Sequence, residues 1–107
     1  MSVIDRNKID LISTNPEGKV VLTISDHLIW DDDNKHLLVL QDKINDYLDV
    51  LQSDQIYEVY PDALGKQIIV QAVFEYLPNK TGEEFLFKVG QFLKSNGYEF
   101  NYYHLNG

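Results

Sequence analysis

The sequence contains no cysteine and only three prolines in its 107 residues. Disulfide scaffolds, zinc sites with cysteine ligands and thiol chemistry are therefore excluded. Basic residues are also scarce, because 9 lysines and arginines stand against 17 acidic residues, which gives a formal charge of −8. This charge opposes contact with phosphate backbones and with anionic lipid surfaces, so we expect neither a nucleic acid nor a membrane as a partner.

Long apolar runs are missing as well. No stretch approaches the roughly 18 apolar residues of a membrane-spanning helix, and residues 1–6 lack the apolar run of a signal peptide. The apolar share is nevertheless 44%, and 12% of the residues are aromatic, which suffices for one hydrophobic core. We therefore expect one cytoplasmic domain over residues 1–107, since a domain usually holds about 100 to 200 residues.

The first half of the sequence predicts a β-hairpin followed by a helix. Residues 8–13 and 19–25 alternate between apolar and polar side chains, and the turn-forming residues 14–18 separate them. A helix is predicted over residues 34–52, where apolar side chains recur within an arc of about 100°. These side chains are Leu37, Leu40, Ile44, Tyr47, Leu48 and Leu51.

The second half predicts three strands and a second helix. Residues 55–60, 66–76 and 98–104 are rich in β-branched and aromatic side chains, which favour strands. Between the last two of these runs, Thr81 and Glu84 have the spacing of a capping box at a helix start. Gly97 suits the left-handed position just past the end of that helix.

The predicted element order is therefore ββαββαβ. It indicates an α+β domain in two layers, with two helices on one face of an antiparallel sheet. Without its first strand the order becomes βαββαβ, which is the ferredoxin-like arrangement. The predicted fold is accordingly ferredoxin-like with an added N-terminal strand.

Two stretches carry a resemblance to a known group of sequences. They are residues 18–30 (GKVVLTISDHLIW) and residues 36–48 (HLLVLQDKINDYL). Together they resemble an uncharacterised bacterial family of small single-domain proteins of unknown function. The resemblance implies a bacterial, single-domain, cytoplasmic protein, and it transfers no catalytic or binding residue.

The densest run of potential metal ligands precedes and enters the first predicted helix. Its members are His27, Asp31, Asp32, Asp33 and His36. Histidine and carboxylate suit zinc or manganese when three of them converge. The alternative is that the aspartates cap the helix and favour its positive end. We expect no cofactor, and we keep His27, Asp31, Asp33 and His36 as the candidate ligands if a metal is bound.

The first helix also carries a row of carboxylates opposite its apolar stripe. Asp42, Asp46 and Asp49 share this face. They form either a contact for a basic partner protein or a solvated helix surface.

Three aromatic side chains are candidates for protein binding. Phe87 projects at about 200° on the second helix, away from the apolar stripe, which indicates a partner contact or a singly exposed phenylalanine. Trp30 either covers the open end of the core or anchors a partner. Tyr103 belongs to a tyrosine-rich set of predicted strands, and tyrosine is enriched in protein interfaces.

Signature motifs of enzymes are missing from the sequence. It has no glycine-rich phosphate loop, nucleophile elbow or H-E-x-x-H segment, so we expect no enzyme activity. The favoured interpretation is a non-enzymatic protein-interaction module, similar to immunity or adaptor proteins, with a homodimer as one of its forms. The alternative is a regulatory domain that binds a small molecule or a metal.

Overall fold

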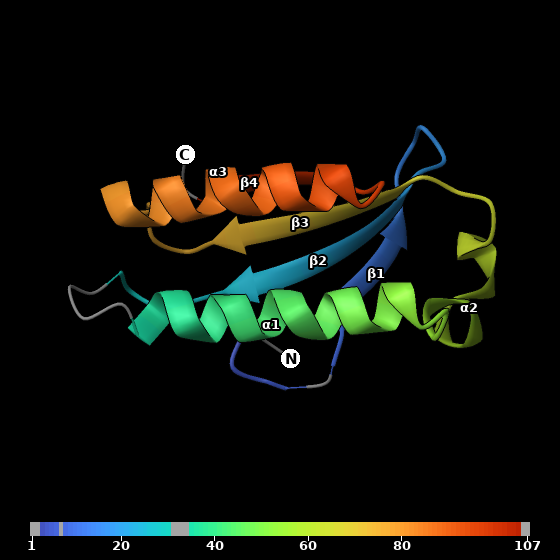
Figure 1. Cartoon of the computed structure of the whole chain (residues 1–107), viewed down its shortest axis with the longest axis horizontal. Helices are drawn as coiled ribbons and strands as arrows, with labels where there is room; N and C mark the ends of the chain where they lie inside the picture. Colours follow the sequence, from blue (N-terminus) through green and yellow to red (C-terminus); the bar gives the residue numbers. More distant parts are fainter. Residues whose placement is uncertain (1–2, 7, 31–34, 106–107) are drawn as a thin grey trace.

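The computed structural model describes residues 3–6, 8–30 and 35–105. In chain order its elements are β1 (Leu11–Thr14), β2 (Val20–Asp26), α1 (Lys35–Gln52), α2 (Ile56–Val59), the 3-10 turn η1 (Pro61–Ala63), β3 (Ile68–Phe74), α3 (Lys80–Ser95) and β4 (Glu99–His104). The four strands lie side by side in the order β1-β2-β3-β4 (Figure 1).

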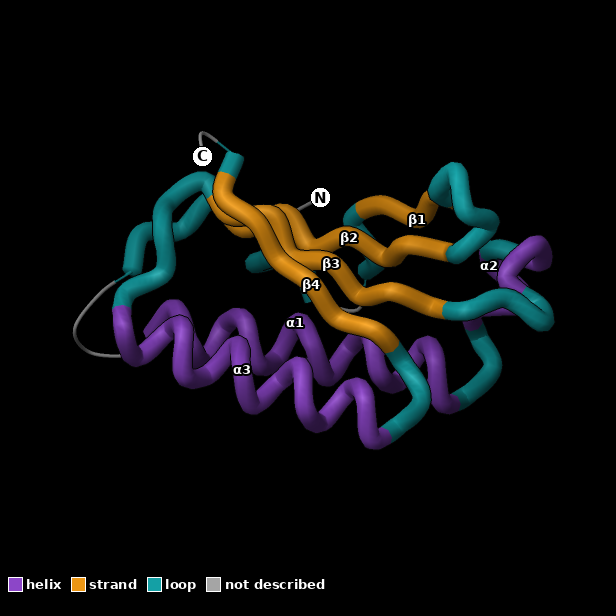
Figure 2. Tube along the Cα trace, turned by 90° about the horizontal axis from the view of Figure 1, so that it is seen from above, coloured by secondary structure: helices purple, strands orange, loops and turns teal. Residues whose placement is uncertain are grey.

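The sheet is mixed. β1 is antiparallel to β2, whereas β2, β3 and β4 are parallel to one another. α1 connects β2 to β3 and α3 connects β3 to β4, and both helices cover the same face of the sheet (Figure 2). The result is a two-layer α+β fold whose core lies between this face and the two helices.

The α+β class and the placement of both helices on one face agree with the sequence, but the antiparallel sheet does not. The predicted strand over residues 55–60 is instead α2, in which Ile56 alone is buried. Aromatic and β-branched residues favour strands only where they can pair with a sheet, and residues 55–60 pair with none of the described strands. Because residues 55–60 form no strand, α1 connects β2 to β3 as a crossover, and β3 runs parallel to β2. The ferredoxin-like arrangement is therefore not confirmed.

The two long helices form where the spacing of apolar residues predicts them. α1 begins and ends within one residue of the predicted range and buries Leu40, Ile44 and Tyr47 against the sheet. The start of α3 was predicted incorrectly: its cap is Asn79, whose side chain accepts a hydrogen bond from Gly82 N at 2.8 Å. Thr81 lies inside the first turn. Gly97 has the expected left-handed backbone, with φ of 89°.

Within the described ranges, no helix combines the length and the apolar character that crossing a membrane requires. The core is built from alternate residues of the two central strands and from the inward stripes of α1 and α3. Its strand members are Val20, Leu22, Ile24, Ile68, Val70, Ala72 and Phe74. The remaining residues of these strands form the opposite face of the sheet, which none of the described helices covers (Figure 2).

Candidate functional site

β4 is the last strand of the sheet, and among the described residues it pairs with β3 alone. The Leu105 N–H donates a hydrogen bond to the Phe74 carbonyl at 2.9 Å, so the backbone polar groups of Leu105 face β3. These groups alternate in direction along a strand. The N–H and C=O groups of Phe100, Tyr102 and His104 therefore face outward, away from the sheet.

The outer edge of β4 lacks most of the features that usually prevent edge pairing. Natural edges are blunted by lysine, proline or bulges, whereas β4 contains none of these over an unbroken six-residue register. Glu99, its one carboxylate, lies at its start and forms an ion pair with Lys19 at 3.1 Å. Within the described residues, this edge is therefore open to an added strand.

Aromatic side chains flank this edge on the helix side. The Phe100 and Tyr102 rings lie 6.2 Å apart between centroids, and Tyr102 lies 5.9 Å from Phe74. On α3, Phe87 is 67% exposed. A hollow of about 310 Å³ separates Phe87 from β4, and Gly90 forms part of its lining. We call Phe87, Gly90, Phe100 and Tyr102 the β4–α3 patch.

A second group of polar side chains lies at the carboxyl end of β2. His36 Nε2 is 2.6 Å from Asp26 Oδ2, and both side chains are almost completely buried. His36 Nδ1 is 3.1 Å from the carbonyl of Ile29, and Asp26 Oδ1 accepts a hydrogen bond from Leu28 N at 3.0 Å. Both ring nitrogens face oxygen acceptors, so both donate when the ring carries two protons.

This arrangement uses His36 internally. Its two nitrogens are occupied by Asp26 and Ile29, and His27 is exposed on the loop after β2. Asp31 and Asp33 lie outside the described residues. Across the part of the chain that the structure describes, no three histidine, aspartate or glutamate side chains are grouped so that they could hold a metal ion.

The strand order also bears on ligand binding at this end of the sheet. In open α/β sheets, ligands bind where neighbouring strands send their helices to opposite faces. Here α1 and α3 follow adjacent parallel strands and cover the same face (Figure 2). The crevice that such a switch in direction creates is therefore not formed between β2, β3 and β4.

A family model described as "Family of unknown function (DUF6572)" matches residues 1–106. The chain belongs to this family. No curated protein and no solved structure matches it. Membership in DUF6572 agrees with the resemblance found in residues 18–30 and 36–48, and it assigns no activity.

In this DUF6572 member, Trp30 is packed between the starts of the two helices. Its ring lies 3.9 Å from the His36 ring between centroids, and its Nε1 donates a hydrogen bond to the Tyr76 carbonyl at 3.2 Å. Gly82 of α3 lies directly against it, since a Cβ on Gly82 would be 2.6 Å from the Trp30 ring. Trp30 therefore covers the end of the core, as one of its two sequence interpretations stated.

The carboxylate row on α1 is partly occupied from within the chain. Arg6 donates two hydrogen bonds to Asp46, at 2.8 and 3.0 Å, and approaches Asp42 at 3.5 Å. Hydrogen bonding to Asp46 raises the pKa of the Arg6 guanidinium. Asp46 is buried, contrary to the predicted solvated row, and Asp49 is exposed.

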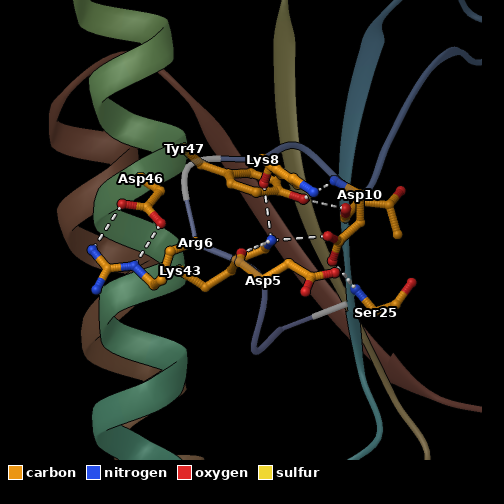
Figure 3. A network of polar contacts seen from close by, with 9 residues as sticks. Asp5, Arg6, Lys8, Asp10, Ser25, Lys43, Asp46 and Tyr47 are labelled. Atoms are coloured by element: carbon orange, nitrogen blue, oxygen red, sulfur yellow. Dashed lines mark hydrogen bonds and ion pairs between the residues drawn. The ribbon is translucent and has the colours of Figure 1, made fainter. Parts of the chain in front are cut away.

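Beside Asp46, a buried polar network joins α1 to the N-terminal segment and β2 (Figure 3). Lys43, at 0% exposure, directs its ammonium group toward Asp10. The Asp10 N–H donates to the Tyr47 hydroxyl at 2.9 Å, and that hydroxyl donates to the Thr23 carbonyl. Burial raises the pKa of Tyr47. Sequence reasoning missed this network, although Lys43 lies on the inward side of α1 between Leu40 and Tyr47.

The other two predicted binding residues lie on different surfaces. Phe87 is exposed, as its position on the helix predicts, and it borders β4. Tyr103 is 48% exposed and follows Tyr102, so it points to the uncovered face of the sheet. Their roles in binding remain predictions.

Proposed function

We propose that this chain is a non-enzymatic protein-interaction module, comparable in role to immunity and adaptor proteins, which binds protein along the outer edge of β4. The observation that carries the proposal is the row of outward N–H and C=O groups on Phe100, Tyr102 and His104. An extended partner segment satisfies such groups by adding a strand to the sheet.

The β4–α3 patch supplies specificity, which backbone pairing alone does not give. Main-chain hydrogen bonds give affinity for any extended segment, whereas side-chain pockets give specificity. The exposed Phe87 and Tyr102 and the hollow between them supply apolar contact area directly beside the edge. Aromatic side chains of this kind often dominate the energy of an interface.

The interaction surface is thus placed differently from the acidic row of α1. Arg6 binds Asp46 and lies near Asp42, so an internal cation already counters part of that negative charge. A basic partner would have to compete with Arg6 at these positions. At β4 the described residues provide no competing strand.

Photo-cross-linking tests the proposal. A photoreactive benzoylphenylalanine replaces Tyr102 in cells that make the protein, and the same residue replaces Val59 on α2 as the control. Both native side chains are exposed, at 41% and 57%. We expect protein adducts at position 102 that Phe87→Glu diminishes, and no such adducts at position 59. Equal yields at both positions, or none at position 102, would contradict the proposal.

A further inference from the structure

The side of α3 next to β4 carries a short stripe of four residues. Glu83, Phe87, Gly90 and Lys94 fall within an arc of about 60° at the usual helical rotation of about 100° per residue. Phe87, Gly90 and Lys94 line the hollow beside β4. Neither Glu83 nor Lys94 forms an ion pair with any residue that the structure describes. The negatively charged Glu83 lies at one end of the stripe and the positively charged Lys94 at the other. Between them lie the large side chain of Phe87 and Gly90, which has no side chain.

This stripe is complementary to the same stripe on a second, antiparallel copy of α3. In an antiparallel second copy, Glu83 of each helix lies opposite Lys94 of the other, because the two charges are equally distant from the midpoint. Phe87 lies opposite Gly90 for the same reason. The protruding ring thus meets the position that has no side chain, and each contact occurs twice. Two-fold symmetric dimers are built from self-complementary surfaces of this kind.

The edge of β4 accepts a second copy of itself in a defined register. In an antiparallel pair, residues whose polar groups face the partner must lie opposite each other. The outward residues of β4 are Phe100, Tyr102 and His104. A two-fold axis beside Asn101 places Phe100 opposite Tyr102 of the second copy, and aromatic pairs across strands are favourable.

The α3 stripe and the β4 edge require a two-fold axis at nearly the same place. Gly90 lies over Phe100, since a Cβ on Gly90 would be 3.5 Å from the Phe100 ring. The midpoint of the α3 stripe lies between Lys88 and Val89, about 2 Å along the helix from Gly90 at a rise of about 1.5 Å per residue. Because α3 runs opposite to β4, this point lies just beyond Phe100, where one strand residue spans about 3.3 Å. It lies between Phe100 and Asn101, nearer to Asn101.

We propose that β4 and α3 form the interface of a symmetric homodimer, with β4 paired to β4 and the Glu83 and Lys94 side chains paired between the two α3 helices. The proposal rests on the proposed function and names its partner as a second copy of this chain. The two four-stranded sheets then join into one continuous sheet.

Charge exchange on α3 tests the homodimer. Sedimentation velocity over a range of concentrations compares the wild type with Glu83→Lys, Lys94→Glu and the double variant Glu83→Lys/Lys94→Glu. Both side chains lie near the surface of α3, and a thermal melt of each variant confirms that it folds. Each single variant places two like-charged pairs across the interface, so we expect its dimer dissociation constant to rise about tenfold or more. The double variant restores opposite charges, and its constant should return to within about threefold of the wild type.

The outcomes separate the two proposals. A wild type that stays monomeric up to millimolar concentration overturns the homodimer, and so does a dimer whose dissociation constant is the same in all four proteins. If cross-linking at position 102 then captures a different protein, β4 remains a binding edge and only its partner is wrong. If position 102 captures nothing and the wild type is monomeric, both proposals are wrong.

Discussion

Lys43 and Asp10 form an ion pair inside the core, with 2.9 Å between Nζ and Oδ1 and at most 1% exposure of either side chain. The ammonium group also donates hydrogen bonds to the carbonyls of Asp5 and Lys8, at 2.6 and 2.9 Å. Two of its three N–H groups therefore donate to backbone carbonyls, beside the ion pair with Asp10. Asp10 in turn accepts a hydrogen bond from Ser25 N, so the pair joins α1, the N-terminal segment and β2.

Replacing Lys43 should therefore destabilise the fold strongly. Lys43→Met leaves the Asp10 carboxylate buried without its cation, and we expect the free energy of unfolding to fall by about 3–5 kcal/mol. Urea unfolding measures the change. The exposed Lys66→Met serves as the control and should stay within about 0.5 kcal/mol of the wild type. Similar values for the two variants would show that the ion pair does not hold these elements together.

Tyr47 makes stability depend on pH in the alkaline range. Burial raises the pKa of Tyr47, so the folded chain keeps a proton that the unfolded chain loses above about pH 10. The free energy of unfolding should then fall as the pH rises through this range. Tyr47→Phe should cost about 1–3 kcal/mol at neutral pH, because it leaves the Asp10 N–H unpaired. Above pH 10 the free energy of unfolding of Tyr47→Phe should fall less than that of the wild type. Urea unfolding at several pH values measures both, and parallel pH dependences of the two proteins would contradict this account.

Gly82 is required because Trp30 lies against it. Alanine usually stabilises a helix relative to glycine by up to about 1 kcal/mol, yet a Cβ at this position would meet the Trp30 ring at 2.6 Å. We expect Gly82→Ala to lower the free energy of unfolding by about 1–3 kcal/mol and to shift the emission of the single tryptophan.

Gly90→Ala is the matched control for Gly82→Ala on the same helix. There a Cβ meets the Phe100 ring at 3.5 Å, which is an ordinary contact. Measured in dilute solution, this variant should be as stable as the wild type or more stable, with unchanged emission. Equal destabilisation by both substitutions would contradict the contact between Trp30 and Gly82.

The cap of α3 distinguishes the structure from the motif in its sequence. Asn79→Ala removes the acceptor for the Gly82 N–H and should cost about 0.5–2 kcal/mol. Thr81→Ala should change the free energy of unfolding by less than about 0.5 kcal/mol, although the sequence motif assigns the cap to Thr81. Thermal unfolding of the two variants decides between these assignments, and a larger loss for Thr81→Ala would favour the motif.

The elements predicted well are those whose signal is local. The apolar spacing of α1 and the left-handed Gly97 depend on residues close in sequence, and both are confirmed. The parallel pairing of β2 with β3 was missed because it depends on whether residues 55–60 find a place in the sheet. Strand propensity does not contain that information.

The candidate site shows the same division between local signals and contacts that are distant in the sequence. The exposure of Phe87 follows from its angle on one helix. The partners of Lys43 and His36 come from 33 and 10 residues away in the sequence, at Asp10 and Asp26. A lysine on the inward side of α1 does call for a buried acid. With 17 acidic residues in the chain, however, the pattern does not say which one.

Amide hydrogen exchange along β4 tests the central claim, that its outer edge binds protein, most directly. The amides of Asn101 and Tyr103 face β3 and should exchange slowly at every concentration, which provides an internal reference. The amides of Phe100, Tyr102 and His104 should exchange fast in dilute solution. They should become as slow as the reference amides once the second copy, or a partner captured at position 102, is bound. Outward amides that stay fast in every such sample would contradict the account.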